Sequence, residues 1–112
     1  MKTSELRLQQ DCWLWLWNRH PELRGLFFRI KNEGTNRITG ARDKASGVIP
    51  GVADSCLLVP GGKAVFIEFK TESGKQSPVQ SDWQAKVQGA WFRYEVVRSL
   101  DEFQTLIANL LT

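Results

Sequence analysis

Short, almost continuous runs of apolar residues occupy the middle of the chain and are typical of β-strands. Two such runs, at 56–59 and 64–69, flank the turn sequence Pro-Gly-Gly at 60–62 and predict a β-hairpin. Further runs at 26–30 and 90–97 predict one strand before the hairpin and one after it.

The N-terminal segment predicts a helix that Thr3 or Ser4 caps and that ends near Asn18. The run at 12–17 also alternates like a strand, but its length and the flanking caps favour a helix. We expect the apolar face of this helix to be formed by Leu6, Trp13, Leu16 and Trp17.

The tryptophans at 13, 15 and 17 cannot all point into one small core, because each step of two residues turns a helix by about 200°. At least one of the three should therefore be exposed. It would serve as a contact between two copies of the chain, which we favour, or as a surface on which bases stack.

Two later helices begin with capping residues. Ser77 at the cap, Pro78 in the first turn and Gln80 three residues on predict a helix that Gly89 ends. Ser99 with Glu102 predicts the start of a terminal helix. The apolar positions of the two helices are Val79, Trp83 and Val87 in the first, and Leu100, Phe103, Ile107 and Leu110 in the second.

The order of these elements predicts an α/β fold. A short helix joins the strand at 64–69 to the strand at 90–97, and such a unit is typically a parallel, right-handed crossover. Since the hairpin is antiparallel, we expect a mixed sheet flanked by helices, with one additional helical turn at 41–45. The length of 112 residues suits a single domain, 1–112, with a modest core.

The second hairpin strand carries charge where a core needs apolar residues. A period of two divides its residues between two faces: Phe66, Glu68 and Lys70 on one, and Val65, Ile67 and Phe69 on the other. Burying a carboxylate and an ammonium among apolar neighbours is costly unless they meet a partner. These positions are therefore candidates for chemistry or for a tight ion pair.

The register of the hairpin decides whether Asp54 joins them. A two-residue loop would place Asp54 opposite Phe69 and on the wrong face of the sheet. A three-residue loop or a bulge would place it opposite Glu68 or Lys70, and we predict such an odd loop.

Asp54 and Glu68 would then form a cation site. Two carboxylates about 5 Å apart repel by roughly 3 kcal/mol at an effective dielectric constant near 20, and a divalent cation removes that conflict. Their oxygens, with the carbonyl of Phe69, suit Mg²⁺, for which Mn²⁺ can substitute. Lys70 would orient or deprotonate a bound water, or neutralise charge on a phosphate. This arrangement fits phosphodiester hydrolysis.

Positive charge is concentrated in one segment. The segment 29–44 contains five basic and two acidic residues. Its excess of three positive charges equals the net charge of the whole chain, +3. The basic residues predicted to contact a nucleic acid are Lys31, Arg37, Arg42 and Lys44. The alternative is that Arg37, Arg42 and Lys44 form a solvated surface.

Other classes of protein find little support. Cys12 and Cys56 lack metal-binding spacing and are expected to be buried thiols. We find no serine or cysteine nucleophile with a histidine partner and no glycine-rich phosphate loop. Without a long apolar run or a signal peptide, the protein is expected to be cytoplasmic, with no membrane partner.

The sequence Gly-Val-Ala-Asp at 51–54, a hairpin and Glu-Phe-Lys at 68–70 resemble the PD-(D/E)XK nuclease superfamily. The surrounding residues resemble its VRR-NUC branch: Asn-Glu-Gly at 32–34, Ser-Pro-Val-Gln at 77–80 with Trp83, and Gly89. Ala53 stands where that branch usually has proline, which would only fix the backbone before the acid.

The resemblance implies a restriction-endonuclease-like αβββαβ core and a Mg²⁺-dependent DNA endonuclease. It also implies a preference for branched DNA, as in Holliday-junction resolvases of bacteria or phages. A chain this short would present two sites to a junction as a homodimer. Alternatives are a nuclease directed at flaps or ends, and a non-catalytic basic module in which Glu68 and Lys70 are an exposed ion pair.

Glu5 and Gln80 each have two interpretations. Glu5 complements the dipole of the first helix, or it completes the metal site, as the resemblance to resolvases implies. Gln80 completes a capping box, or it lies at the active site, again as the resemblance implies.

Overall fold

A computed structural model describes the backbone of residues 2–31 and 37–112 and the side chains of 5–31 and 40–112. Its helices are α1 (Lys2–Arg19), α2 (Arg37–Ala45), α3 (Pro78–Gly89) and α4 (Leu100–Leu110), with a short 3-10 helix at Pro21–Leu23. Its strands are β1 (Phe27–Arg29), β2 (Ser55–Val59), β3 (Lys63–Phe69) and β4 (Arg93–Val97).

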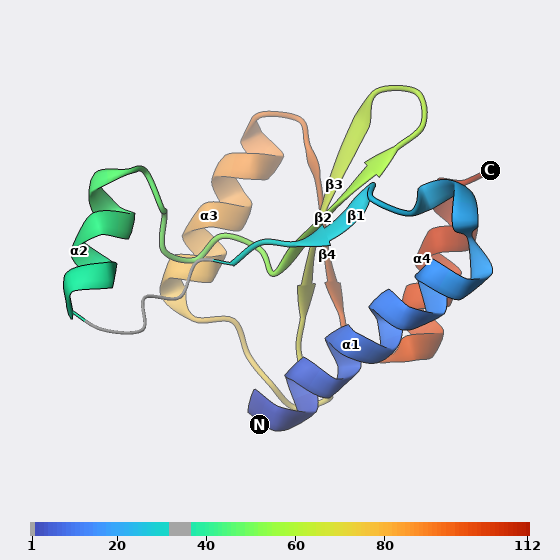
Figure 1. Ribbon diagram of the computed structural model, residues 1–112, viewed down its shortest axis with the longest axis horizontal. Coiled ribbons are helices and arrows are strands. Elements are labelled where there is room, and N and C mark those ends of the chain that lie inside the picture. The colour runs from blue at the N-terminus through green and yellow to red at the C-terminus, as the bar shows by residue number, and fades with distance from the viewer. Residues whose placement is uncertain (1, 32–36) are drawn as a thin grey trace.

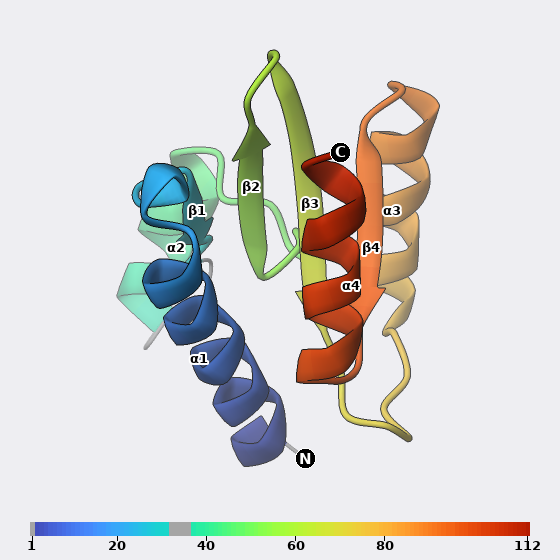
Figure 2. The same ribbon diagram turned by 90° about the vertical axis from the view of Figure 1, so that its right-hand side faces the viewer.

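These strands form one mixed sheet in the order β1-β2-β3-β4. The pairs β1/β2 and β2/β3 are antiparallel, and β4 lies parallel to β3, as the crossover at α3 predicted. Helices α1 and α4 cover one face of the sheet and α3 covers the other (Figures 1 and 2). The predicted α/β class and the mixed sheet flanked by helices are confirmed.

The main core lies between the sheet and the pair α1 and α4. Val65, Ile67 and Phe69 of β3 face it, as their alternation predicted. The Phe103 ring on α4 is fully buried against Phe69 and Phe27. A smaller cluster under α3 contains Ala53, Val87 and Tyr94, with Phe66 and Trp83 packed against it. The charged residues of β3 therefore lie on the face with the smaller core.

The first helix differs from its prediction in two respects. It begins at Lys2, before Thr3 and Ser4, so neither residue stands ahead of it as a cap. Of the four residues expected on its apolar face, only Leu16 is buried, because Cys12 and Leu16, and not the tryptophans at 13 and 17, belong to the main core.

The tryptophans of α1 divide between the core and the surface. Trp15 packs edge-on against Phe103. Trp13 and Trp17 remain 39% and 38% exposed and stack on each other with ring centroids 4.9 Å apart. The prediction that at least one tryptophan is exposed is confirmed.

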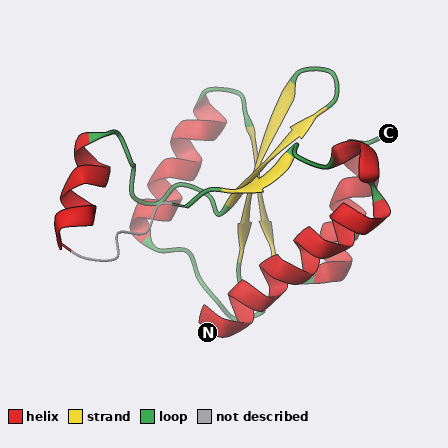
Figure 3. Cartoon of the chain, in the orientation of Figure 1, coloured by secondary structure: helices red, strands yellow, loops and turns green. Residues whose placement is uncertain are grey.

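Helix α2 is longer than the single turn predicted at 41–45. It begins at Arg37 and stands away from the sheet at the edge of the molecule, as Figure 3 shows. Gly40 lies inside the helix, and because glycine is a poor helix former, helix propensity did not predict the first turn. Gly47, with φ of +96°, follows its end.

The two predicted cysteine thiols are free and buried, as expected. Burial, followed by the nearby charge of Asp11, raises the pKa of Cys12 to about 12. Burial also raises the pKa of Cys56. Neither thiol is therefore a nucleophile at neutral pH. None of the described helices has the length and apolar character needed to cross a membrane.

The chain returns from α2 to the sheet through a glycine that touches α3. Gly51 has a φ of +85°, and a Cβ placed on it would lie 2.3 Å from the carbonyl oxygen of Val79. Only glycine permits both this backbone conformation and this close approach. Gly51 thus sets the distance between the segment leading to Asp54 and the first turn of α3.

Replacing Gly51 with alanine should therefore destabilise the protein by about 1–3 kcal/mol more than replacing Gly47. Gly47 is the matched control, since its φ is also positive but a Cβ there meets no atom within 4 Å. The measurement is urea unfolding of the two variants and the parent. Equal losses would show that the contact with Val79 imposes no constraint.

Candidate active site at the end of the hairpin

The hairpin loop has three residues, as predicted. Val59 pairs with Lys63, so the residues at 60–62 form the loop, and Gly61 and Gly62 both have positive φ. Ser55 pairs with Ile67 at the other end of the ladder. Extending this register by one residue places Asp54 opposite Glu68.

Asp54 is fixed by hydrogen bonds to both neighbouring strands. Its Oδ2 accepts from the backbone N–H of Phe69 at 2.7 Å, and its carbonyl accepts from the N–H of Ile30 at 2.7 Å. Because the N–H and C=O of a strand residue point to the same side, the carbonyl of Phe69 is also directed toward Asp54. Two predicted oxygen donors thus lie on the same side of β3.

Glu68 is fully buried, with two differently placed oxygens. The hydroxyl of Tyr94 donates a hydrogen bond to Oε1. Oε2 is buried and has no hydrogen-bond partner among the described residues. Lys70 is 8% exposed, and its Nζ lies 3.8 Å from Oε2, which is an ion-pair distance but longer than a hydrogen bond. One carboxylate oxygen of Glu68 is therefore left without a hydrogen-bond donor among the described residues.

The three predicted residues share one electrostatic environment. Burial raises the pKa of Asp54, and the charges of Glu68 and Glu5 add to that effect. The N–H of Phe69 and the charge of Lys70 oppose it without cancelling it. Burial, the hydrogen bond to Glu68 and the Glu68 charge raise the pKa of Tyr94 well above its usual range, so its hydroxyl stays protonated.

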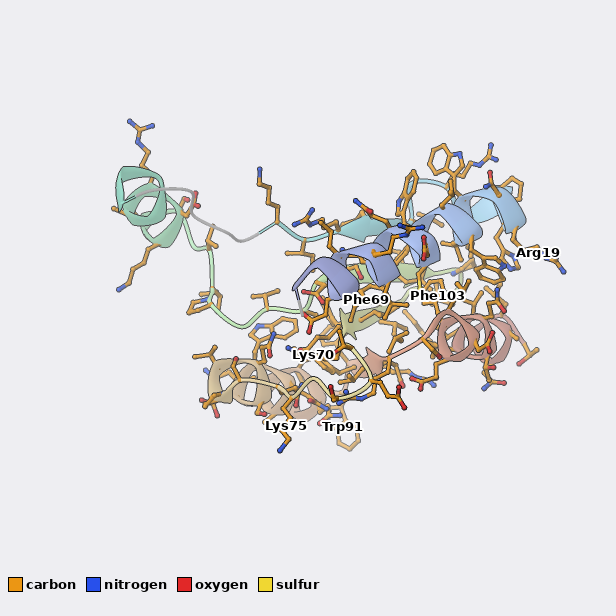
Figure 4. All side chains as sticks on the ribbon, turned by 90° about the horizontal axis from the view of Figure 1, so that it is seen from below. Arg19, Phe69, Lys70, Lys75, Trp91 and Phe103 are labelled. Atoms are coloured by element: carbon orange, nitrogen blue, oxygen red, sulfur yellow. The ribbon has the colours of Figure 1, made fainter. Side chains whose placement is uncertain are left out.

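A cleft of about 500 Å³ opens beside Asp54. Helix α1 contributes Glu5 and Gln9 to its wall, and the start of α3 contributes Gln80. Glu68 and Lys70 lie buried next to Asp54, and Figure 4 shows Lys70 between α1 and α3. A substrate in the cleft would therefore meet Asp54 first.

The donor set fits a hard divalent cation. Two carboxylates lie near a backbone carbonyl, and one carboxylate oxygen has no hydrogen-bond partner among the described residues. Such oxygens suit Mg²⁺ or Mn²⁺. Within the described part of the chain, no three His, Cys, Asp or Glu side chains are close enough to form a metal-binding group. Glu5 thus lines the cleft in the first turn of α1 without completing a three-carboxylate cluster.

Gln80 completes a capping box, and it also borders the cleft. Its Oε1 accepts from the N–H of Ser77 at 2.8 Å, and its own N–H donates to Ser77 Oγ.

At α4 the capping box is only half formed. Ser99 accepts from the N–H of Glu102, but the Glu102 carboxylate accepts from the N–H of Arg98.

The predicted basic contacts lie apart from the acids. Lys31 follows β1, and Arg42 and Lys44 are exposed on α2. The side chain of Arg37 and the Asn-Glu-Gly sequence at 32–34 lie outside the described residues. Arg29, which was not singled out among the site residues, lines the cleft from the end of β1.

Tyr94 is the other site residue that the sequence did not reveal. It pairs with Phe66 in the parallel register of β3 and β4, which brings it to the same face as Glu68. Period-two alternation in β4 could have shown that Tyr94 faces α3. Nothing local in the sequence gives the register between two strands joined by a helix.

No family model matches the chain, and no curated protein matches it. Solved structures do match it. One, described as "VRR_NUC domain protein", superposes with a TM-score of 0.80 at 16% identity, over 96% of this chain and 88% of that one. The chain has the VRR-NUC fold. The second, described as "VRR_NUC domain", has a TM-score of 0.64 at 24% identity and covers 94% of this chain and 95% of that one.

Replacing Asp54 with asparagine should stabilise the metal-free VRR-NUC fold at neutral pH by roughly 2–5 °C, because it removes a buried charge and keeps an acceptor for Phe69. The folded-state pKa of Asp54 is above its ordinary value of 3.8, so the native state binds more protons. The stability advantage of the variant should therefore grow as pH rises from 3.8 through the raised pKa, and then level off.

Thermal unfolding in chelator across this pH range measures the effect. Adding Mn²⁺ should raise the melting temperature of the parent but not that of the variant. A variant that is less stable than the parent at neutral pH would contradict this account of Asp54.

Proposed function

We propose that this chain is a Mg²⁺-dependent DNA endonuclease that acts on branched DNA as a homodimer, with four-way junctions as its substrate. One observation carries the proposal: Glu68 is buried beside Asp54 and Lys70, and its Oε2 has no hydrogen-bond partner among the described residues. A structural ion pair would leave no such oxygen without a donor. The VRR-NUC fold supports a nuclease-type function.

In this proposal Asp54, Glu68 and the carbonyl of Phe69 would hold the cation, which would polarise the phosphate and activate a water. Lys70 positions that water, or neutralises the charge that develops on the phosphate. Attack of the water oxygen on phosphorus breaks the bond to the 3′ oxygen, which takes up a proton. The products carry 5′-phosphate and 3′-hydroxyl ends.

The exposed tryptophan pair on α1 supports association of two copies. Trp13, Trp17 and the neighbouring Leu14 leave a large apolar surface in contact with solvent. Twofold pairing through such a surface would present two sites to two strands of a junction.

The burial of the ion pair argues against the non-catalytic alternative. That alternative needs Glu68 and Lys70 to be an exposed surface pair, but their side chains are 1% and 10% exposed. A buried ion pair whose carboxylate keeps one oxygen without a hydrogen bond is a poor way to gain stability.

Purified protein should cleave a labelled four-way junction faster than a flap or a linear duplex, with two chains per junction, in Mg²⁺ or Mn²⁺ but not in chelator. Asp54→Asn, Glu68→Gln and Lys70→Ala should each slow cleavage by at least about 100-fold. Lys75→Ala is the matched control for the lysine, since Lys75 is exposed on the loop after β3 and points outward (Figure 4).

Several results would count against parts of the proposal. Cleavage by the Lys70 variant at the parent's rate would remove the lysine from the mechanism. Faster cleavage of flaps would move the substrate to that class. Salt-sensitive binding without metal-dependent cleavage would leave a basic binding module.

Arg42 and Lys44 on α2 are proposed to contact phosphates. Replacing either with alanine should weaken binding to all DNA sequences and reduce the slope of log K against log salt concentration by about 1. Arg19→Ala is the control, since Arg19 is exposed at the opposite end of the molecule from α2 (Figure 4). Binding titrations from low to moderate salt measure the slopes, and equal slopes for all variants would leave these bases as solvated surface.

A further inference from the structure

Tyr94 is held rigidly on the face of the sheet that α3 covers. The residue is 6% exposed and packs in one cluster with Ala53 and Val87. The Trp83 ring lies against it, with centroids 5.9 Å apart. Packing of this kind fixes the ring and hence the position of the hydroxyl.

Polar side chains lead from α3 through Tyr94 to Glu68. The side chain of Gln76, just before the helix, interacts with the Tyr94 hydroxyl, and that hydroxyl donates a hydrogen bond to Glu68 Oε1. Gln76 is itself fixed by two residues of α3: its Nε2 donates to Gln84 Oε1 at 2.7 Å, and its Oε1 accepts from Ser81 at 3.2 Å. The start of α3 therefore fixes a polar side chain beside the tyrosine hydroxyl.

This hydrogen bond makes the two oxygens of Glu68 unequal. Oε1 is occupied by the tyrosine hydroxyl, and Oε2 faces Lys70 without a hydrogen-bond partner among the described residues. Oε2 is then the oxygen more available to a cation.

We propose that Tyr94 is a positioning residue, itself oriented by Gln76, that restricts Glu68 to binding the metal through the single oxygen Oε2. This inference rests on the proposed function, since it assumes that Glu68 is a metal ligand. Hydrogen bonds from outside the ligand set commonly fix a ligand in this way, and their loss weakens metal binding.

The test is Tyr94→Phe, which removes the hydroxyl and keeps the packed ring. Mn²⁺ affinity, measured without DNA by electron paramagnetic resonance, should fall by about tenfold. In cleavage assays the Mg²⁺ concentration for half-maximal rate should rise while the KM for DNA stays unchanged. Gln76→Ala should shift both metal readouts in the same direction by a smaller factor.

Val87→Ala is the matched control, because it weakens the same cluster and leaves the hydroxyl in place. It should lower the melting temperature without changing Mn²⁺ affinity. In a double variant with Glu68→Gln, Tyr94→Phe should cause no further loss of affinity.

The possible failures are distinguishable. A parent protein that binds no Mn²⁺ would overturn both the metal site and this role for Tyr94. A parent that binds Mn²⁺ and cleaves DNA, together with a Tyr94→Phe variant whose affinity lies within twofold of it, would overturn the positioning role alone. An equal loss of affinity in Val87→Ala would reduce Tyr94 to a packing residue.

Discussion

The pairing of β2 with β3 is the constraint on which the candidate site depends. Side chains in a sheet alternate strictly, so a slip of one residue in this hairpin would bring Asp54 opposite Phe69 instead of Glu68. The loop at 60–62 prevents that slip, because two glycines with positive φ close a turn of three residues. The turn at one end of the paired strands thus determines which residues lie opposite each other at the other end.

The two faces of the sheet divide stability from chemistry. The face under α1 and α4 carries a continuous apolar core, while the face under α3 contains a buried carboxylate and a buried lysine. Burial of such groups is unfavourable, and the larger core offsets that cost. This division is typical of proteins in which a functional site lowers stability and the rest of the fold compensates for it.

Alternation and capping patterns predicted the hairpin, its loop, the faces of β3 and the cap of α3 from sequence alone. These features depend on residues that are neighbours in the chain. The prediction of which side of α1 is buried was wrong in part. Trp13 and Trp17 stack on each other at the surface, and Cys12 and Leu16 lie in the core. Tyr94 was not predicted as a site residue. Its partner Glu68 is 26 residues away, and the register between their strands is a property of the tertiary fold.

The hydrogen bond between Ile30 and Asp54 has an evolutionary consequence. It joins the two ends of the excursion that carries α2, so the chain leaves the sheet and returns to it at adjacent points. Insertions or deletions within that excursion need not alter strand pairing. Such a layout would let a lineage exchange the segment that carries α2 while it inherits the same candidate site.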